Sequence, residues 1–235
     1  MPASLDTSGV RALWTGRSEG DQRALVCGSE APAPVPPGRR LRRLHQVHGA
    51  TVLAVDTPAP AGLSVEWPAE PGAPPPDADA LVSRGSASCL AVLTADCAPV
   101  ALSSPEGAFG AVHVGWRGLL AGVVERAVAA LRALGATQVS AGLGPCIGPC
   151  CYGFAAPERE LLAGRYGEGV RAETASGDPA VDLRAGVRSA LALCGARLVL
   201  DQVACTACGG DYFSFRAHRD EGRQALLVWM EDHPD

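Results

Sequence analysis

Three short segments place metal-binding side chains beside glycine or proline: residues 44–49, 93–100 and 111–118. They contain His48, Cys97 and His113, which together offer two imidazoles and one thiol. Such a set suits zinc and leaves a fourth coordination position for water or substrate. Sixteen positions separate Cys97 from His113, enough for a strand, a turn and a returning strand, whereas His48 can join them only through the fold. We therefore predict a metal centre assembled from three segments.

A structural interpretation of the same residues competes with this one. His113 alternates with Phe109 and Ala111 along an apolar run, as a hydrogen-bonded histidine inside a core would. A single cysteine such as Cys97 is more often a small buried apolar residue than a ligand. Residue types and spacing alone therefore do not decide between a metal centre and a core.

The segments around these residues have the composition of buried strands. Short runs rich in valine and leucine, bounded by Asp, Pro, Ser or Gly, are typical of strands in a core. Such runs occupy Cys89–Ala95, Val100–Ser103 and Ala108–Val114. Further strands are predicted at Val139–Leu143, Arg197–Leu200 and Ala225–Met230.

Other segments have the periodicity of helices. Apolar residues recur at 3.6-residue spacing over Leu119–Leu134, and Gly135 supplies the end of this helix. Two more helices are predicted over Pro157–Tyr166 and Asp182–Cys194, the second ended by Gly195. Because strands and helices mix without strict alternation, we predict an α+β fold with a mixed sheet.

A chain of 235 residues is expected to form a single domain, residues 1–235. Two proline-rich stretches, near 30–40 and 57–77, are interpreted as surface loops. The segment between them is too short to be a domain of its own, so these stretches are loops rather than linkers.

Composition and charge exclude several classes of function. The net charge of −5 argues against a nucleic-acid partner bound through a basic face. All 20 basic side chains are arginine, which excludes Schiff-base chemistry and a phosphate-binding lysine. The longest apolar segment, Leu119–Leu134, contains three charged residues, so no membrane span is expected. Nine cysteines and a start without leader regions favour reduced thiols, and we expect a cytoplasmic monomer.

Four sequence motifs carry a resemblance to a known family. The motifs QVHG, TADCAPV, AVHVGWRGL and GLGPCIGPCCYGF follow one another in this order. They resemble motifs of the YfiH/YlmD family, earlier described as a multicopper polyphenol oxidase or laccase domain and now as purine nucleoside phosphorylases. The resemblance runs from about Arg17 to Met230. It implies a fold of layered mixed β-sheets flanked by helices, and it places His48, Cys97 and His113 at the family's zinc-ligand positions.

The same resemblance implies a function. The chain is expected to be a zinc-dependent purine nucleoside phosphorylase, which converts adenosine or inosine and phosphate to the free base and ribose 1-phosphate. Adenosine deamination is also implied, so zinc is the expected cofactor, and purine nucleosides and phosphate are the expected partners. The laccase description fits the composition poorly, because a blue-copper site takes two His and a Cys. Five histidines in the chain cannot also fill a trinuclear copper cluster.

Arginine and acidic residues next to the motifs are candidates for the catalytic steps. Asp96, adjacent to Cys97, is the nearest carboxylate for proton transfer. Arg117 follows His113 at a strand-to-helix turn, where free N–H groups also favour anions, and is a candidate catalytic residue that stabilises phosphate charge. Arg216 lies in a Phe-Ser-Phe-Arg stretch that matches the family and suits bidentate phosphate binding. A turn carboxylate and surface arginines are the structural alternatives.

Two further residues are candidates for binding the substrate. Gly144 lies in a Gly-Leu-Gly-Pro stretch whose bare backbone N–H groups suit an anion or base pocket. Asp79, in the stretch Asp-Ala-Asp-Ala-Leu-Val-Ser, suits the orientation of a ligand, although an acidic turn residue is the ordinary interpretation.

The remaining cysteines offer a second group of thiols. Cys205 and Cys208 form a CxxC pair, and Cys146, Cys150 and Cys151 lie close together along the chain. A zinc ribbon requires two such pairs with matched knuckles, and the Gly- and Pro-rich stretch 146–151 is not one. The sequence therefore gives little support to a second metal or a redox pair.

Two other functions fit the same residues. The first is a metal-free Cys–His hydrolase, with Cys97 as nucleophile and His113 as base, acting on a cell-wall precursor or another amide or ester. The second is a non-catalytic metal-binding protein whose pocket is lost. Segment 13–20, a degraded form of the family's N-terminal motif, favours this second alternative. Two measurements separate the phosphorylase, the hydrolase and the non-catalytic protein: the metal content, and the release of base from adenosine with and without phosphate.

Overall fold

The computed structural model describes residues 2–6, 8–27, 35–56 and 74–231. Most of the two proline-rich stretches near 30–40 and 57–77 lies outside these residues. Within the described part, residues 35–39 and 74–76 belong to no helix or strand, and a strand begins at Arg40.

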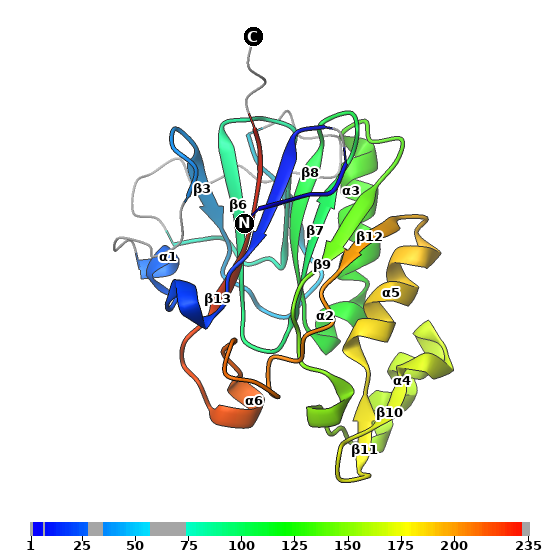
Figure 1. The fold of residues 1–235 in the computed structure, drawn as a ribbon. Helices are drawn as coiled ribbons and strands as arrows, with labels where there is room; N and C mark the ends of the chain where they lie inside the picture. Colours follow the sequence, from blue (N-terminus) through cyan, green and yellow to red (C-terminus); the bar gives the residue numbers. More distant parts are fainter. Residues whose placement is uncertain (1, 7, 28–34, 57–73, 232–235) are drawn as a thin grey trace.

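Two mixed β-sheets form the centre of the fold (Figure 1). The first has five strands in the order β1 (Ala3–Ser4), β2 (Val10–Trp14), β13 (Gln224–Met230), β6 (Ser88–Thr94) and β3 (Arg40–Arg43). The second has six, in the order β12 (Arg197–Asp201), β9 (Ser140–Leu143), β7 (Ala98–Ser103), β8 (Phe109–Val114), β5 (Ala80–Ser83) and β4 (Val52–Ala54). Three pairs, β3–β6, β4–β5 and β9–β12, are parallel, and the other pairs are antiparallel.

The sheets face one another across an apolar core. Apolar side chains of both sheets form this core. The five-stranded sheet contributes Leu90, Val92, Leu226 and Val228, and the six-stranded sheet contributes Leu81, Ala101, Phe109 and Ala111. The burial of both faces of β7 and β8 explains their continuous apolar sequences, because a strand covered on two sides cannot alternate apolar with polar residues.

Helices cover the outer face of the six-stranded sheet (Figure 1). They are α2 (Trp116–Ala121), α3 (Val123–Ala133) and α5 (Leu183–Leu193), with α4 (Ala156–Tyr166) and the hairpin of β10 (Arg171–Glu173) and β11 (Pro179–Val181) packed beside them. Short helices α1 (Ala24–Cys27) and α6 (Phe215–His218) and three 3₁₀ turns, Arg17–Glu19, Pro149–Cys151 and Glu168–Val170, complete the described elements. The predicted α+β fold of layered mixed sheets flanked by helices is confirmed.

The predicted elements agree with the structure except in one helix. The six predicted strands correspond to β6, β7, β8, β9, β12 and β13, and helix α5 follows Asp182, whose side chain accepts a hydrogen bond from the Ala185 N–H at 2.9 Å. The helix predicted over Leu119–Leu134 begins earlier and is divided at Gly122, whose φ of 85° ends α2 and starts α3. Apolar periodicity does not register this break, because it continues through both helices. Among the residues that the structure describes, no helix has the length and hydrophobicity of a membrane span.

Candidate metal centre

The candidate site lies where the chain crosses between the two sheets. Residues 44–51 connect β3 to β4, residues 95–97 connect β6 to β7, and residues 202–223 connect β12 to β13. Each connection leads from the five-stranded sheet to the six-stranded sheet or back. Because two such crossings carry His48 and Cys97 and the third carries Arg216, the topology gathers candidates that are far apart in the sequence.

His48, Cys97 and His113 meet at these crossings and form one cluster, called here the His–Cys–His centre. Their ligand atoms all lie within 4.8 Å of one another, and the Cys97 Sγ is 4.0 Å from the His48 Nδ1. The register that pairs Pro99 with His113 brings the turn of Cys97 alongside the end of β8. Zinc bonds of about 2.3 Å to sulfur and about 2.1 Å to nitrogen in a tetrahedron separate the two atoms by about 3.6 Å, which is close to the distance between the Cys97 Sγ and the His48 Nδ1. The donor set therefore fits zinc.

Gly115 leaves the space that the His48 ring occupies. A Cβ atom at this position would lie 2.6 Å from the His48 Nδ1 and 3.3 Å from the Cys97 Sγ. The rings of His48 and His113 stand edge to face, with centroids 4.9 Å apart. The absence of a side chain at Gly115 is thus a condition for the approach of the ligands.

Asp79 holds the centre from behind. It is completely buried, and its Oδ1 accepts hydrogen bonds from the His113 Nδ1 at 2.8 Å and the His48 N–H at 3.0 Å. Its Oδ2 accepts the Gly49 N–H at 2.6 Å. A carboxylate behind a metal-binding imidazole fixes the tautomer and the ring orientation, so the Nε2 of His113 is the atom left for a metal. The structure thus places Asp79 behind the ligands and not on the wall of the cavity.

The charges of the centre reinforce one another. Burial opposes ionisation of Asp79, but the His113 ring and the N–H groups of Gly49 and His48 lower its pKa below the ordinary value. Burial also raises the pKa of the Cys97 thiol, but the neighbouring His113 and His48 lower this pKa to about 6 overall. Burial lowers the pKa of His113, whereas the Cys97 thiolate and Asp79 raise it to about 9 overall. A thiolate is the form in which cysteine binds metals or acts as a nucleophile.

A cavity of about 650 Å³ opens over the His–Cys–His centre. Small-molecule sites have volumes of roughly 300–1,000 Å³, so this cavity has the size for a nucleoside. Four arginines line it: Arg23, Arg117, Arg216 and Arg223. Of the predicted site residues, Asp96 also lines it. The cavity thus combines a candidate metal centre with a cationic wall.

Asp96 connects the centre to the third crossing. It is almost fully buried and has a positive φ of 96°, which the three-residue turn between β6 and β7 imposes. Its Oδ1 accepts a hydrogen bond from the Thr206 hydroxyl at 2.8 Å, and its Oδ2 accepts the Arg216 N–H at 2.6 Å. The carboxylate beside Cys97 thus binds the segment that carries Arg216.

Arg216 projects from α6 over aromatic rings at the cavity wall. Its guanidinium lies 4.9 Å from the centroid of the Tyr152 ring, and its Nη1 donates to the Gly153 carbonyl at 2.9 Å. Within the described part of the chain, neither Arg216 nor Arg117 forms an ion pair with a carboxylate. Arg117 is exposed, and its guanidinium lies 4.6 Å from the centroid of the Trp116 ring. Both cations are therefore available to an anionic ligand.

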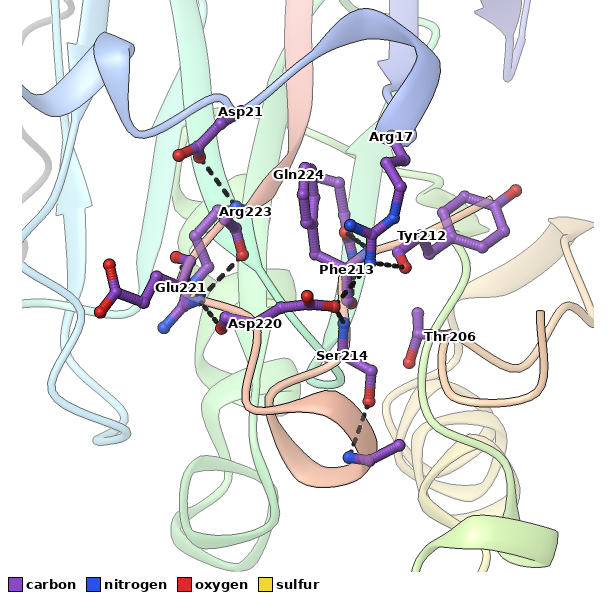
Figure 2. A network of polar contacts seen from close by, with 12 residues as sticks. Arg17, Asp21, Thr206, Tyr212, Phe213, Ser214, Asp220, Glu221, Arg223 and Gln224 are labelled. Atoms are coloured by element: carbon purple, nitrogen blue, oxygen red, sulfur yellow. Dashed lines mark hydrogen bonds and ion pairs between the residues drawn. The ribbon is translucent and has the colours of Figure 1, made fainter. Parts of the chain in front are cut away.

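A polar network holds the α6 segment in place (Figure 2). The Asp220 Oδ2 accepts the Ser214 N–H at 2.9 Å and an Arg17 Nη2–H at 2.6 Å. The same Arg17 nitrogen donates to the Tyr212 carbonyl at 3.1 Å, and the guanidinium lies 4.4 Å from the Phe213 ring centroid. Arg17 comes from the segment 13–20 that the sequence shows as a degraded motif, and here it positions one wall of the cavity.

Arg223 and Gln224 bind the backbone on the two sides of α6 (Figure 2). The Nη1 of Arg223 donates to the carbonyls of Asp220, Glu221 and Gly222 at 3.1, 2.7 and 2.9 Å. The Gln224 side chain bonds both the N–H and the carbonyl of Phe213, at 2.8 and 3.2 Å. These bonds act on the backbone, so they set the position of α6 and not only of one side chain.

Gly144 lies away from the cavity lining. Its N–H donates to the Pro99 carbonyl at 2.9 Å, and a Cβ atom there would lie 2.1 Å from the Cδ1 of Trp14. The glycine thus admits a ring from the other sheet. The lining also contains polar residues for which no role is predicted from the sequence, among them Arg23, His45, Gln46, Tyr152 and Arg223. Three of these positions, His45, Gln46 and Tyr152, stand in or next to the motifs, which is the signal that could have identified them.

Comparisons with known proteins match the chain over most of its length. A family model described as multi-copper polyphenol oxidoreductase laccase matches residues 14–231. A purine nucleoside phosphorylase of Streptomyces griseus is 43% identical over 194 residues, which cover 80% of this chain and 73% of the relative. The crystal structure of a Neisseria meningitidis protein of the family model DUF152 has a TM-score of 0.77 at 26% identity and covers 99% of both chains. That of YlmD from Geobacillus stearothermophilus has a TM-score of 0.75 at 24% identity and covers 96% of this chain and 93% of YlmD.

Proposed function

The chain belongs to the YfiH/YlmD family of laccase-like domains, whose matched relatives are named purine nucleoside phosphorylases, and on this premise we propose that it is a zinc-dependent purine nucleoside phosphorylase. The proposed substrates are phosphate and adenosine or inosine, and the products are the free base and ribose 1-phosphate. The observation that carries the proposal is the joint presence, in one cavity, of a His–Cys–His centre and four arginines. The proposal extends to adenosine deamination, in which water adds to C6 of the purine ring, the amino group leaves as ammonia and the bond from C1′ to the base stays intact.

Phosphorolysis requires an anion site beside the nucleoside. In the reaction a phosphate oxygen forms a bond to C1′ of the ribose, the bond from C1′ to the base nitrogen breaks, and the base leaves with the electron pair and gains a proton. A chain without lysine must hold the phosphate with arginine and backbone N–H groups. Arg216 and Arg117 are free of carboxylate partners in the described residues, and a guanidinium binds phosphate through two parallel bonds.

The His–Cys–His centre would hold the zinc through His48, Cys97 and the Nε2 of His113. When bound, zinc supplies a positive charge next to oxygen atoms of the substrates. Asp79 keeps the His113 ring in one orientation and the backbone of His48 in place. Asp96 is the residue proposed to exchange a proton with the substrate, because among the described residues each of its oxygens accepts one hydrogen bond and a carboxylate has about four acceptor sites.

One observation favours a second candidate function, a metal-free hydrolase. Cys97, His113 and Asp79 follow one another as nucleophile, base and orienting carboxylate do in a catalytic triad. His48 has no necessary part in such a triad, and this difference separates the two functions. A laccase activity has less support, since in the described residues His48 and His113 are the only histidines in a metal-binding cluster.

Replacing Arg216 by lysine tests the phosphate site. Lysine keeps the positive charge but cannot form the two parallel hydrogen bonds of a guanidinium. The loss of one charged hydrogen bond to phosphate weakens phosphate binding by about 1.5–3 kcal/mol. We expect the KM for phosphate to rise about 10- to 100-fold with zinc content unchanged. Adenosine deamination, measured in the absence of phosphate, should change little, because water needs no anion site.

Arg117→Lys provides the parallel variant, and Arg126→Lys, an exposed position on α3 outside the cavity lining, is the matched control. Steady-state kinetics at several phosphate concentrations are sufficient for all three. An unchanged phosphate KM in both Arg216→Lys and Arg117→Lys would place the phosphate elsewhere and contradict this part of the proposal.

A further inference from the structure

Four cysteines form a second cluster, outside the His–Cys–His centre. Cys150 and Cys151 lie in the 3₁₀ turn after β9, and Cys205 and Cys208 lie in the connection from β12 to β13. Their sulfur atoms all lie within 4.8 Å of one another, although 54 or more positions separate the two pairs along the chain. We call this group the four-cysteine cluster.

The sheet topology explains why the two pairs meet. Strands β9 and β12 are parallel neighbours, so the chain leaves both at the same edge of the sheet. The two exit segments then continue side by side, with an isolated parallel β-bridge between the backbones of residues Cys146 and Cys205 and a hydrogen bond from the Thr206 N–H to the Cys146 carbonyl at 3.2 Å. The approach is close at Gly148, where a Cβ atom would lie 3.2 Å from the Cβ of Cys205. The fold thus supplies the matched second pair that the sequence does not reveal.

The sulfur positions suit one tetrahedral ion. Cys150 and Cys208 sulfurs are 3.3 Å apart, those of Cys151 and Cys208 are 3.5 Å apart, and those of Cys150 and Cys205 are 3.8 Å apart. Zinc–sulfur bonds of about 2.3 Å in a tetrahedron separate neighbouring sulfurs by about 3.8 Å. The eight cysteines whose side chains are described, these four among them, are free thiols and not disulfides.

The chemistry of the donors points to the same kind of ion. Four thiolates in tetrahedral array are typical of zinc or of iron–sulfur centres. The Gly148 N–H donates to the Cys205 Sγ at 3.1 Å, a bond that favours the thiolate form and orients the sulfur. Three of the cysteines are half-buried, and Cys208 is exposed at the mouth, so an ion can enter and is then largely enclosed. We propose that the four-cysteine cluster binds one structural zinc ion, separate from the His–Cys–His centre.

The position of this second ion gives it a role in the cavity. Thr206, between the cysteines of the CxxC pair, donates its hydroxyl to Asp96. Tyr152, next to Cys151, lines the cavity beneath Arg216. An ion that joins the two exit segments therefore fixes both the partner of Asp96 and the ring below the guanidinium. Its loss should loosen this wall without removing any ligand of the His–Cys–His centre.

The metal content and sulfur coordination of the purified full-length protein test the proposal without any substitution. We expect two zinc ions per chain by elemental analysis. One site with one sulfur and one site with four sulfurs give an average of about 2.5 sulfur ligands per zinc in X-ray absorption spectra. Intact mass spectrometry of unreduced protein should show all thiols reduced.

Two variants assign the ions to their sites. Cys150→Ser combined with Cys208→Ser should keep one zinc with about one sulfur ligand, since two remaining thiolates hold zinc poorly. His48→Asn should keep one zinc with about four sulfur ligands. Cys194→Ser, at a half-buried free cysteine outside both clusters, is the matched control and should keep two ions.

The outcomes separate this proposal from the proposed function. A single zinc with four sulfurs in the unmodified protein would support the four-cysteine site and count against zinc in the phosphorylase site. A single zinc with one sulfur would overturn the four-cysteine site and leave the phosphorylase proposal intact. Iron in place of zinc, or a disulfide between the two pairs in metal-free protein, would also overturn it.

Discussion

Replacing His48 by asparagine is expected to remove the ion from the His–Cys–His centre and to lower kcat/KM for inosine phosphorolysis about 10³-fold or more. The loss follows because two ligands hold zinc poorly, and a metal next to developing charge contributes several kcal/mol at about 1.4 kcal/mol per tenfold in rate. Asparagine is chosen because His48 has a φ of 58°, a left-handed conformation that asparagine tolerates. Zinc content and steady-state kinetics measure the effect.

The same variant separates the phosphorylase from a metal-free hydrolase. A nucleophile–base pair of Cys97 and His113 needs no third imidazole, so the hydrolase alternative predicts an active His48→Asn protein. The Cys97→Ala protein should be inactive whether the enzyme is a phosphorylase or a hydrolase, and it serves as the inactive reference. A His48→Asn enzyme with full activity after exhaustive chelation would contradict the metal-dependent mechanism.

Replacing Asp79 by asparagine is expected to weaken zinc binding at the His–Cys–His centre by about 10- to 100-fold, the usual cost of losing a carboxylate behind a metal-binding histidine. An amide has one oxygen and one NH₂ group, whereas Asp79 accepts N–H bonds on both oxygens. In either orientation of the asparagine, an NH₂ group faces a backbone or ring N–H. A buried donor without an acceptor costs about 1–3 kcal/mol, which should also lower the free energy of unfolding.

Competition with a chromophoric chelator measures the zinc affinity of this variant, and denaturant unfolding at saturating zinc measures its stability. Asp77→Asn is the matched control, because Asp77 is two residues away, is exposed and, within the part of the chain that the structure describes, pairs with the exposed His45. Zinc affinity in the control should equal that of the unmodified protein. An Asp79→Asn protein with unchanged affinity would show that the buried carboxylate does not position the ligands.

Much of the fold was predictable because apolar strands buried on both faces have a strong sequence signal. The predicted run Ala108–Val114 corresponds to β8, Phe109–Val114, all of whose residues are buried. The division of the long helix at Gly122 was not predictable from apolar periodicity, because a glycine inside a helical pattern is often tolerated and only its φ of 85° shows the break. Strand β4 was missed because it has only three residues, and β5 because it follows directly on an acidic stretch that was interpreted as a turn.

The candidate site shows the same division between local and long-range information. Cys97 directly precedes β7 and His113 lies on β8, the antiparallel partner of β7, as their spacing predicted. The role of Asp79 was hidden, because a carboxylate in a turn-like sequence looks exposed, and only the fold shows it buried behind His113. The four-cysteine cluster was not predicted, because the stretch 146–151 lacks the form of a second knuckle to match the CxxC pair of Cys205 and Cys208. Parallel strands bring the two pairs together over a long separation in the sequence.

The fate of the ribose tests the central claim most directly. Zinc-loaded protein is incubated with inosine in phosphate buffer and in a phosphate-free buffer, and hypoxanthine and ribose 1-phosphate are quantified by chromatography and ³¹P NMR. We predict that hypoxanthine and ribose 1-phosphate form in equal amounts and only when phosphate is present. Hypoxanthine released at the same rate without phosphate, together with free ribose, would show hydrolysis and contradict the assignment as a phosphorylase.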